Sequence, residues 1–115
     1  MSDEIVGKAG GESAAVVALT TVDADFDAIG MARALVERGL ASCVNVLPGV
    51  TSVYRWKGEL KADPEQQLII KTTTDRAGSL EKAIRELHPY DVPEFIVLPI
   101  SRISEDYLKF LKELD

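Results

Sequence analysis

The densest group of chemically active side chains lies between His88 and Glu94, in the run His-Pro-Tyr-Asp-Val-Pro-Glu. It holds the only histidine of the chain, an aromatic hydroxyl, two carboxylates and two prolines. Each proline fixes φ at about −65° and pushes the preceding residue out of helical geometry. We therefore expect a stiff, extended segment, which either connects a helix to a strand or forms one wall of a binding site.

Cys43 and His88 are the candidate metal ligands. A thiolate suits soft ions such as Cu(I), and an imidazole binds copper or zinc. Each residue also has a structural interpretation, as a small buried side chain for the cysteine and as a favourable charge at a helix end for the histidine. These two ligands cannot complete a tetrahedral site. A metal would also need carboxylates, such as Asp91 or Glu94, or several copies of the chain.

Tyr54 and Trp56 share one face of a predicted strand because they lie two residues apart. They either pack against a neighbouring sheet or form one wall of a small pocket, with Lys71 and Glu94 supplying opposite charges. Lys71 follows an apolar run, and a buried lysine needs an acidic partner or an anionic ligand. The sequence contains no Ser-His-Asp, P-loop or GxGxxG motif. Because no motif names a reaction, we expect a binding protein rather than an enzyme.

The first half of the chain predicts a strand, a helix and a long second strand. Residues 16–22 form a β-branched run, which is typical of a buried strand. Asp23 or Asp25 can cap a following helix, whose apolar residues recur at helical spacing and which Gly39 ends. Those apolar residues are Ile29, Ala32, Val36 and Leu40, with Leu35 beside them. Residues 43–57 alternate as in a strand, and Pro48-Gly49 predicts a bulge within it.

The second half predicts a returning strand, a helix, a strand and a final helix. Residues 62–65 (Ala-Asp-Pro-Glu) indicate a turn, followed by a strand over 68–73. An amphipathic helix over 80–87 contains a Glu81–Arg85 pair, and residues 95–100 form the next strand. Ser104 caps the last helix. Its buried side carries Leu108, Leu111 and Leu114.

The order β-α-β-β-α-β plus a terminal helix indicates an α+β, ferredoxin-like fold with an antiparallel sheet and both helices on one face. Val44 and Val46 are expected to face the helices, which leaves Cys43 and Asn45 on the opposite face. That face is also apolar, and two helices cannot cover both sides of the sheet. We expect another copy of the chain to cover it.

Composition narrows the class of protein. The chain has 115 residues with a net charge of −6, which argues against nucleic acid or an anionic membrane as a partner. No apolar run approaches the roughly 20 residues of a membrane span. A single cysteine and an N-terminus without a signal-peptide core predict a cytoplasmic protein. We expect a flexible tail over 1–15 and one domain over 16–115, which needs no cofactor to fold.

Four blocks together resemble the CutA family, the divalent-cation tolerance proteins. They are the runs 41–46 (ASCVNV), 52–58 (SVYRWKG), 70–73 (IKTT) and 88–94 (HPYDVPE). The resemblance extends in order and at the expected spacing from about Val16 to the C-terminus. It implies a ferredoxin-like fold similar to that of the PII signalling proteins, assembled as a homotrimer.

The resemblance also implies a response to metal ions and binding of copper or another divalent cation, through Cys43 and His88. Some relatives have a second histidine where this chain has Leu87. The pocket of the family, near subunit contacts, corresponds to Tyr54, Trp56, Lys71, Tyr90 and Glu94. Two alternatives stay open: a PII-like sensor or signalling adaptor that binds a small anionic ligand between subunits, and a structural trimeric scaffold.

Overall fold

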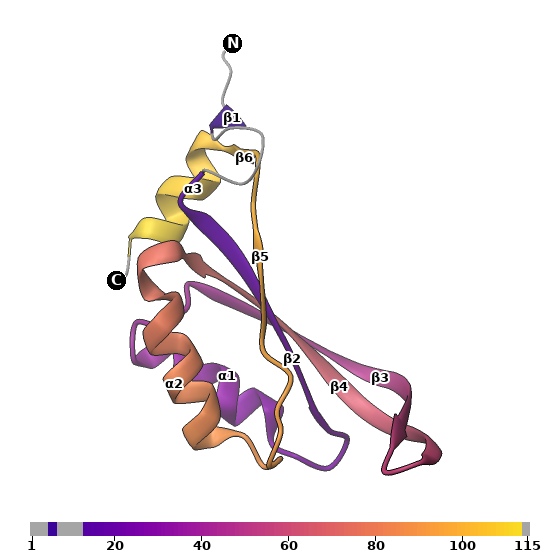
Figure 1. The fold of residues 1–115 in the computed structure, drawn as a ribbon. Helices are drawn as coiled ribbons and strands as arrows, with labels where there is room; N and C mark the ends of the chain where they lie inside the picture. Colours follow the sequence, from indigo (N-terminus) through magenta and orange to yellow (C-terminus); the bar gives the residue numbers. More distant parts are fainter. Residues whose placement is uncertain (1–4, 7–12, 114–115) are drawn as a thin grey trace.

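A four-stranded antiparallel sheet organises the fold in the computed structural model, which describes residues 5–6 and 13–113 (Figure 1). The spatial order of the strands is β3-β4-β2-β5. Their bounds are β2 (Ala15–Asp23), β3 (Cys43–Trp56), β4 (Glu59–Thr73) and β5 (Ile96–Pro99). Every neighbouring pair runs antiparallel. Together with two intervening helices, this order confirms the predicted ferredoxin-like class.

Helices α1 (Ala28–Glu37) and α2 (Ala77–Leu87) lie on the same face of the sheet (Figure 1). A short 3₁₀ turn, η1 (Thr74–Arg76), leads from β4 into α2. The core lies between these helices and the strands. Its largest fully buried side chains are Leu35, Leu68, Ile70, Leu80 and Ile84. Val44 and Val46 pack against this core, as predicted.

The start of α1 differs from the prediction, and its end confirms it. Asp27, not Asp23 or Asp25, caps the helix, because its carboxylate accepts a hydrogen bond from the N–H of Gly30 at 2.9 Å. At the other end Gly39 takes φ of 73°. Its left-handed conformation lets the N–H of Leu40 donate to the carbonyl of Leu35, which closes the last turn.

The buried side of α1 is also shifted from the one that we predicted. Ile29 and Val36 are exposed, at 61% and 43% of their surface. The buried residues are Ala28, Met31, Ala32 and Leu35. Both sets follow helical spacing, so local periodicity alone cannot choose between them, and packing against the sheet decides.

The predicted turn at 62–65 is wrong. The hairpin turns at Lys57 and Gly58, whose φ values of 50° and 83° match a type I′ turn, and β4 continues through Pro64. A proline is tolerated there because β2 ends at Asp23, so this part of β4 has a neighbouring strand on one side only. The register shift between Leu47 and Val50 confirms the predicted bulge.

The C-terminal helix α3 (Glu105–Lys112) packs beside the short strand β6 (Ile103–Ser104). Ser104 caps it, as predicted, by accepting a hydrogen bond from the N–H of Tyr107 at 3.3 Å. Leu111 is fully buried and Leu108 packs beside it, whereas Leu114 lies outside the described residues. Of the predicted tail, β1 (Ile5–Val6) pairs with β6, and residues 1–4 and 7–12 lie outside the described residues.

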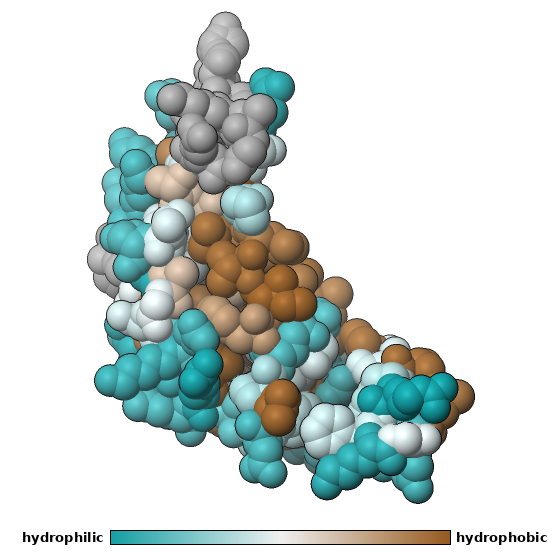
Figure 2. Space-filling view, viewed as in Figure 1, coloured by the Kyte–Doolittle hydropathy of each residue, from teal (hydrophilic) through white to brown (hydrophobic). Residues whose placement is uncertain are grey.

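No helix of the described residues lies on the second face of the sheet (Figure 1). An apolar patch lies over β5 on this side (Figure 2), where Ile96 and Leu98 are each 46% exposed. The strand register continues this surface across the sheet, with Leu98 opposite Val17 and Ile96 opposite Leu19. None of the helices in the described part of the chain is long and apolar enough to span a bilayer.

Candidate functional site

His88 lies at the point where α2 stops and the stiff segment begins. Its N–H still donates to the carbonyl of Ile84 at 2.8 Å, but its own backbone is extended, as a residue before proline should be. The side chain is buried, with 8% of its surface exposed. The chain therefore leaves the helical path at His88.

Both ring nitrogens of His88 take part in hydrogen bonds within the chain. Nδ1 accepts the backbone N–H of Tyr90 at 3.1 Å, so the proton of the neutral ring belongs to Nε2. Nε2 donates it to the carbonyl of Thr21 at 2.8 Å. Burial lowers the pKa of His88, only partly opposed by the Thr21 carbonyl and by the charges of Glu65 and Glu94. The neutral imidazole thus fastens the segment to β2, and a metal ion would have to displace one of these two bonds.

Two tyrosine–carboxylate pairs lie next to this segment. The hydroxyl of Tyr90 donates to Oε2 of Glu65 at 2.5 Å, and the hydroxyl of Tyr54 donates to Oδ2 of Asp63. Burial and the Glu65 carboxylate raise the pKa of Tyr90, while the hydrogen bond to Asp63 is the main reason that the pKa of Tyr54 is raised. Glu65 itself is buried, with 8% of its surface exposed. Both phenols therefore stay protonated and act as donors.

These pairs belong to a cleft of about 810 Å³ between the β3–β4 hairpin and the segment after His88. We call it the hairpin cleft. It is lined by Thr21, Asp23, Ser52, Tyr54, Trp56, Lys61, Asp63, Pro64, Glu65, Pro89, Tyr90, Asp91, Val92 and Glu94. Of the five predicted pocket residues, the fold brings together Tyr54, Trp56, Tyr90 and Glu94.

Lys71 and Cys43 lie elsewhere on the sheet. They are register partners on β4 and β3, and Lys71 in turn pairs with Val17 of β2. Thr21, which receives the His88 bond, is four residues farther along β2, or about 13 Å at roughly 3.3 Å per residue. Within one chain, Cys43 is therefore well separated from His88, and Lys71 from the hairpin cleft.

The described residues of one chain do not form a complete set of metal ligands. Within residues 5–6 and 13–113, no three His, Cys, Asp or Glu side chains are grouped so that they could hold an ion. Cys43 is half-buried on the face of the sheet that lacks a helix. The donors present thus do not fit a resident metal centre in the isolated chain, and copper binding at Cys43 and His88 stays a prediction.

The carboxylates of β4 are the site residues that our sequence analysis missed. Asp63 and Glu65 follow Lys61 at intervals of two residues along β4. All three face the same side of the sheet as Ser52 and Tyr54 of β3. The period of two in a strand would have revealed them. The predicted turn at 62–65 conceals that period, because it places Asp63 and Glu65 outside any strand.

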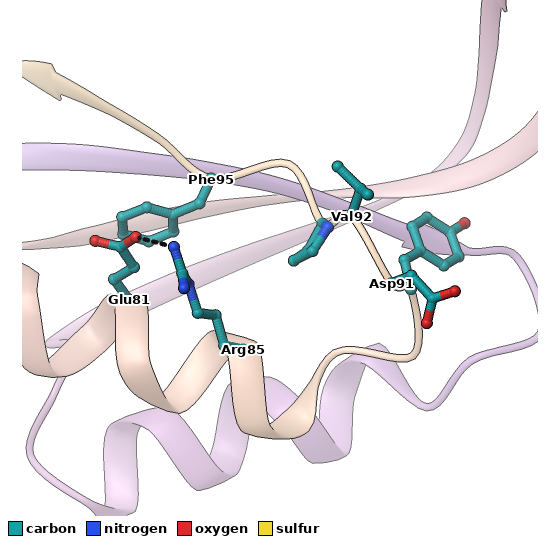
Figure 3. A pocket seen from close by; sticks show the side chains of 7 residues that line it. Glu81, Arg85, Asp91, Val92 and Phe95 are labelled. Carbon is teal, nitrogen blue, oxygen red and sulfur yellow. Dashed lines mark hydrogen bonds and ion pairs between the residues drawn. The ribbon is translucent and has the colours of Figure 1, made fainter. Parts of the chain in front are cut away.

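A second, smaller cavity of about 440 Å³ lies on the other side of the same segment, against α2 (Figure 3). Glu81 and Arg85 form an ion pair at 3.0 Å at its rim, near Phe95. The pair confirms the predicted i,i+4 contact. Because Glu81 and Arg85 already pair with each other, this cavity offers a ligand less than the hairpin cleft does.

Comparison with known proteins identifies the family. The family model described as CutA1 divalent ion tolerance protein matches residues 16–114. The divalent-cation tolerance protein CutA of Thermus thermophilus is 47% identical over 97 residues, which cover 84% of this chain and 94% of that protein. The CutA homolog of Xenopus laevis is 45% identical over 97 residues, and there the matched region spans 84% of this chain but 64% of the relative.

A solved structure gives the same result for the fold. The CutA of Synechococcus elongatus superposes with a TM-score of 0.85 at 35% identity, covering 94% of this chain and 92% of that one. Sequence and fold thus agree over most of the chain. The chain belongs to the CutA1 family of divalent ion tolerance proteins.

Proposed function

We propose that this protein contributes to divalent-cation tolerance by binding cations, copper among them, as a homotrimer. Membership of the CutA1 family supports the link to divalent ions. The absence of a complete ligand set within the described residues argues that a single chain is not the binding unit. A site must then be completed by donors from neighbouring copies.

The uncovered face of the sheet supports assembly. Its exposed apolar side chains include Ile96 and Leu98, each 46% exposed, and Leu47, which is 41% exposed. Large contiguous apolar surfaces on a soluble chain mark interaction sites. Covering this face with copies of the same chain would remove that surface from water. Such burial stabilises an assembly by roughly 25 cal/mol per Å² of apolar area.

The observation that carries the metal proposal is the place of Cys43 on this same face. Its strand register sets it beside Lys71 and opposite the helix layer, half-buried and without a disulfide. A thiol at a subunit contact can meet donors from a second copy, as soft copper ligation requires. His88 is less suited, because both of its nitrogens already hold the chain together.

The proposal is tested by titrating the purified protein with Cu(I) and Cu(II) in a calorimeter. We expect Cys43→Ser to weaken copper binding at least about tenfold, since loss of a thiolate removes the soft ligand. His88→Asn serves as the matched comparison, and we expect it to lower stability more than affinity. Copper binding that is unchanged in Cys43→Ser would contradict the assignment of Cys43.

A further inference from the structure

The hairpin cleft has many more hydrogen-bond acceptors than donors. Both tyrosine hydroxyls already donate to carboxylates, Tyr54 to Asp63 and Tyr90 to Glu65. Five carboxylates line the cleft, from Asp23, Asp63, Glu65, Asp91 and Glu94. Lys61 is the single cationic side chain among the lining residues, and it lies 4.0 Å from Glu59. A ligand that fits here must bring donors and positive charge.

The walls of the cleft are aromatic. Trp56 is 47% exposed, and Tyr54 and Tyr90 are 39% and 37% exposed, so much of each ring is open to solvent. The faces of indole and phenol rings attract organic cations at ring-centroid distances of up to about 6 Å. Pro64 and Pro89 add rigid apolar surface. Aromatic and proline walls suit a ligand with a carbon skeleton better than a hydrated ion.

Tyr90 is held firmly in this wall. Its backbone N–H donates to His88, its hydroxyl donates to Glu65, and its ring lies against the imidazole with centroids 4.8 Å apart. Glu65 is buried although it lines the cleft, so its charge lies in surroundings that water screens less than at the open surface. The wall is thus formed before any ligand arrives, which reduces the entropy lost on binding.

From this geometry we infer that the hairpin cleft binds a small organic cation with primary ammonium groups, such as an aliphatic diamine or polyamine. The ammonium groups donate to Asp63 and Glu65, and the carbon chain lies against Trp56. A simple metal ion fits less well, because no three donors in the described residues are grouped to coordinate it. An anionic ligand is disfavoured by the five carboxylates of the cleft, and within one chain Lys71 lies too far along the sheet to compensate.

This site lies apart from Cys43 and goes beyond the proposed metal function, so the two can fail independently. The test uses the full chain in a chelating buffer without metal, and follows the fluorescence of Trp56, which is the only tryptophan. The probes are 1,4-diaminobutane and spermidine. Magnesium chloride provides the same charge without a carbon skeleton, and 1,4-butanediol provides the skeleton without charge.

We expect both amines to change the emission of Trp56 in a saturable manner, while magnesium and the diol do not. Asp63→Asn and Glu65→Gln should each weaken amine binding about tenfold, since each removes one charge-assisted hydrogen bond. Glu37→Gln removes the same charge from an exposed position on α1, outside the cleft, and should bind like the wild type. Thermal unfolding of each variant checks that the fold is retained.

Three results would overturn the proposal. The amines produce no saturable change, magnesium produces the same change, or Glu37→Gln weakens binding as much as the cleft variants do.

The same ammonium or guanidinium chemistry can come from a basic side chain of a second copy. In that case the emission of Trp56 depends on protein concentration and the amines do not alter it, which would also exclude a small-molecule ligand.

Discussion

His88 illustrates how a residue chosen for possible chemistry can serve structure instead. A lone histidine beside two carboxylates reads as a metal ligand in the sequence. In the fold its Nε2–H donates a hydrogen bond to the carbonyl of Thr21, and its Nδ1 accepts one from the backbone N–H of Tyr90. The buried ring is therefore neutral, and both of its nitrogens are hydrogen-bonded. If Nδ1 were protonated, its N–H would face the backbone N–H of Tyr90, and the hydrogen bond between them would be lost.

This arrangement predicts that the protein loses stability on mild acidification. Because burial lowers the pKa of His88 below its ordinary value of 6.5, the unfolded chain takes up the proton first. The neutral ring therefore makes its full contribution to the unfolding free energy above pH 6.5, and this contribution is lost as the pH falls below that value. One such group changes the unfolding free energy by at most about 1.4 kcal/mol per pH unit.

Urea unfolding at about pH 7.5 and about pH 5.5 measures this effect, with His88→Gln as the control that does not titrate in this range. The difference in stability between wild type and variant should be larger at the higher pH. A constant difference would show that the charge state of His88 does not affect folding.

Thr20 is a second residue whose side chain affects the unfolding free energy of the protein. Its side chain is fully buried on the helix-facing side of β2, and its hydroxyl has no hydrogen-bond partner in the described part of the chain. A buried hydroxyl without a partner costs roughly 1–3 kcal/mol. We expect Thr20→Val to raise the unfolding free energy by about 1 kcal/mol, measured as a higher urea midpoint. Thr20→Ser keeps the hydroxyl and removes a methyl group, so it should be destabilising.

Arg76 joins two elements that are far apart in the sequence, η1 and α3. The guanidinium of this η1 residue donates to the carbonyls of Leu111 and Lys112, at 2.8 and 2.9 Å. The hydroxyl of Ser42 donates to the same Leu111 carbonyl at 2.6 Å. These bonds satisfy carbonyls that the end of α3 leaves without an intrahelical partner.

We expect Arg76→Ala to destabilise the fold by roughly 1.5–3 kcal/mol, and the loss of amide-exchange protection to be largest in α3. Arg38→Ala is the matched control. Its ion pair with Glu86 is 3.7 Å long and about half-exposed on both sides, so its loss should cost less than about 1 kcal/mol. Equal effects of the two substitutions would show that Arg76 contributes only surface charge.

Element order was predictable because each element carries its own period or cap. The spacing of Leu80, Ala83 and Ile84 predicts α2, and Ser104 predicts the start of α3. The buried side of α1 was not predictable, since two overlapping apolar sets share helical spacing. Contacts such as that of Arg76 with Leu111 depend on the finished fold and have no local signal.

The position of the turn between β3 and β4 decides which residues lie together in the hairpin cleft. With the turn at Lys57-Gly58, Tyr54 pairs with Lys61, while Lys71 pairs with Cys43 ten residues farther along β4. The fold of one chain therefore brings Tyr54, Trp56, Tyr90 and Glu94 to the hairpin cleft. Lys71, which the family resemblance groups with them, lies elsewhere on β4. The position of the turn sets the pairing register of β3 and β4. It was hard to predict because Pro64 lies within β4, where a proline normally indicates a turn or the end of a strand.

The uncovered sheet face allows the proposed assembly to be tested directly. Leu98 lies on this face opposite Val17 and is 46% exposed in the single chain. A charge at this position costs the isolated fold little, but it would be buried without a partner once another copy covers the face. We therefore expect Leu98→Glu to dissociate the proposed homotrimer while the circular dichroism spectrum stays unchanged.

Sedimentation equilibrium of wild type and variant provides the measurement, and Ile29→Glu provides the control. Ile29 is also apolar, and is 61% exposed, but it lies on α1 in the helix layer on the opposite side of the sheet. It should leave the mass of the assembly unaltered. If Leu98→Glu keeps the wild-type mass, or if both substitutions dissociate the protein equally, the sheet face is not the contact surface. Because Cys43 lies on the same face, dissociation by Leu98→Glu should also weaken copper binding, which links the assembly to the proposed metal site.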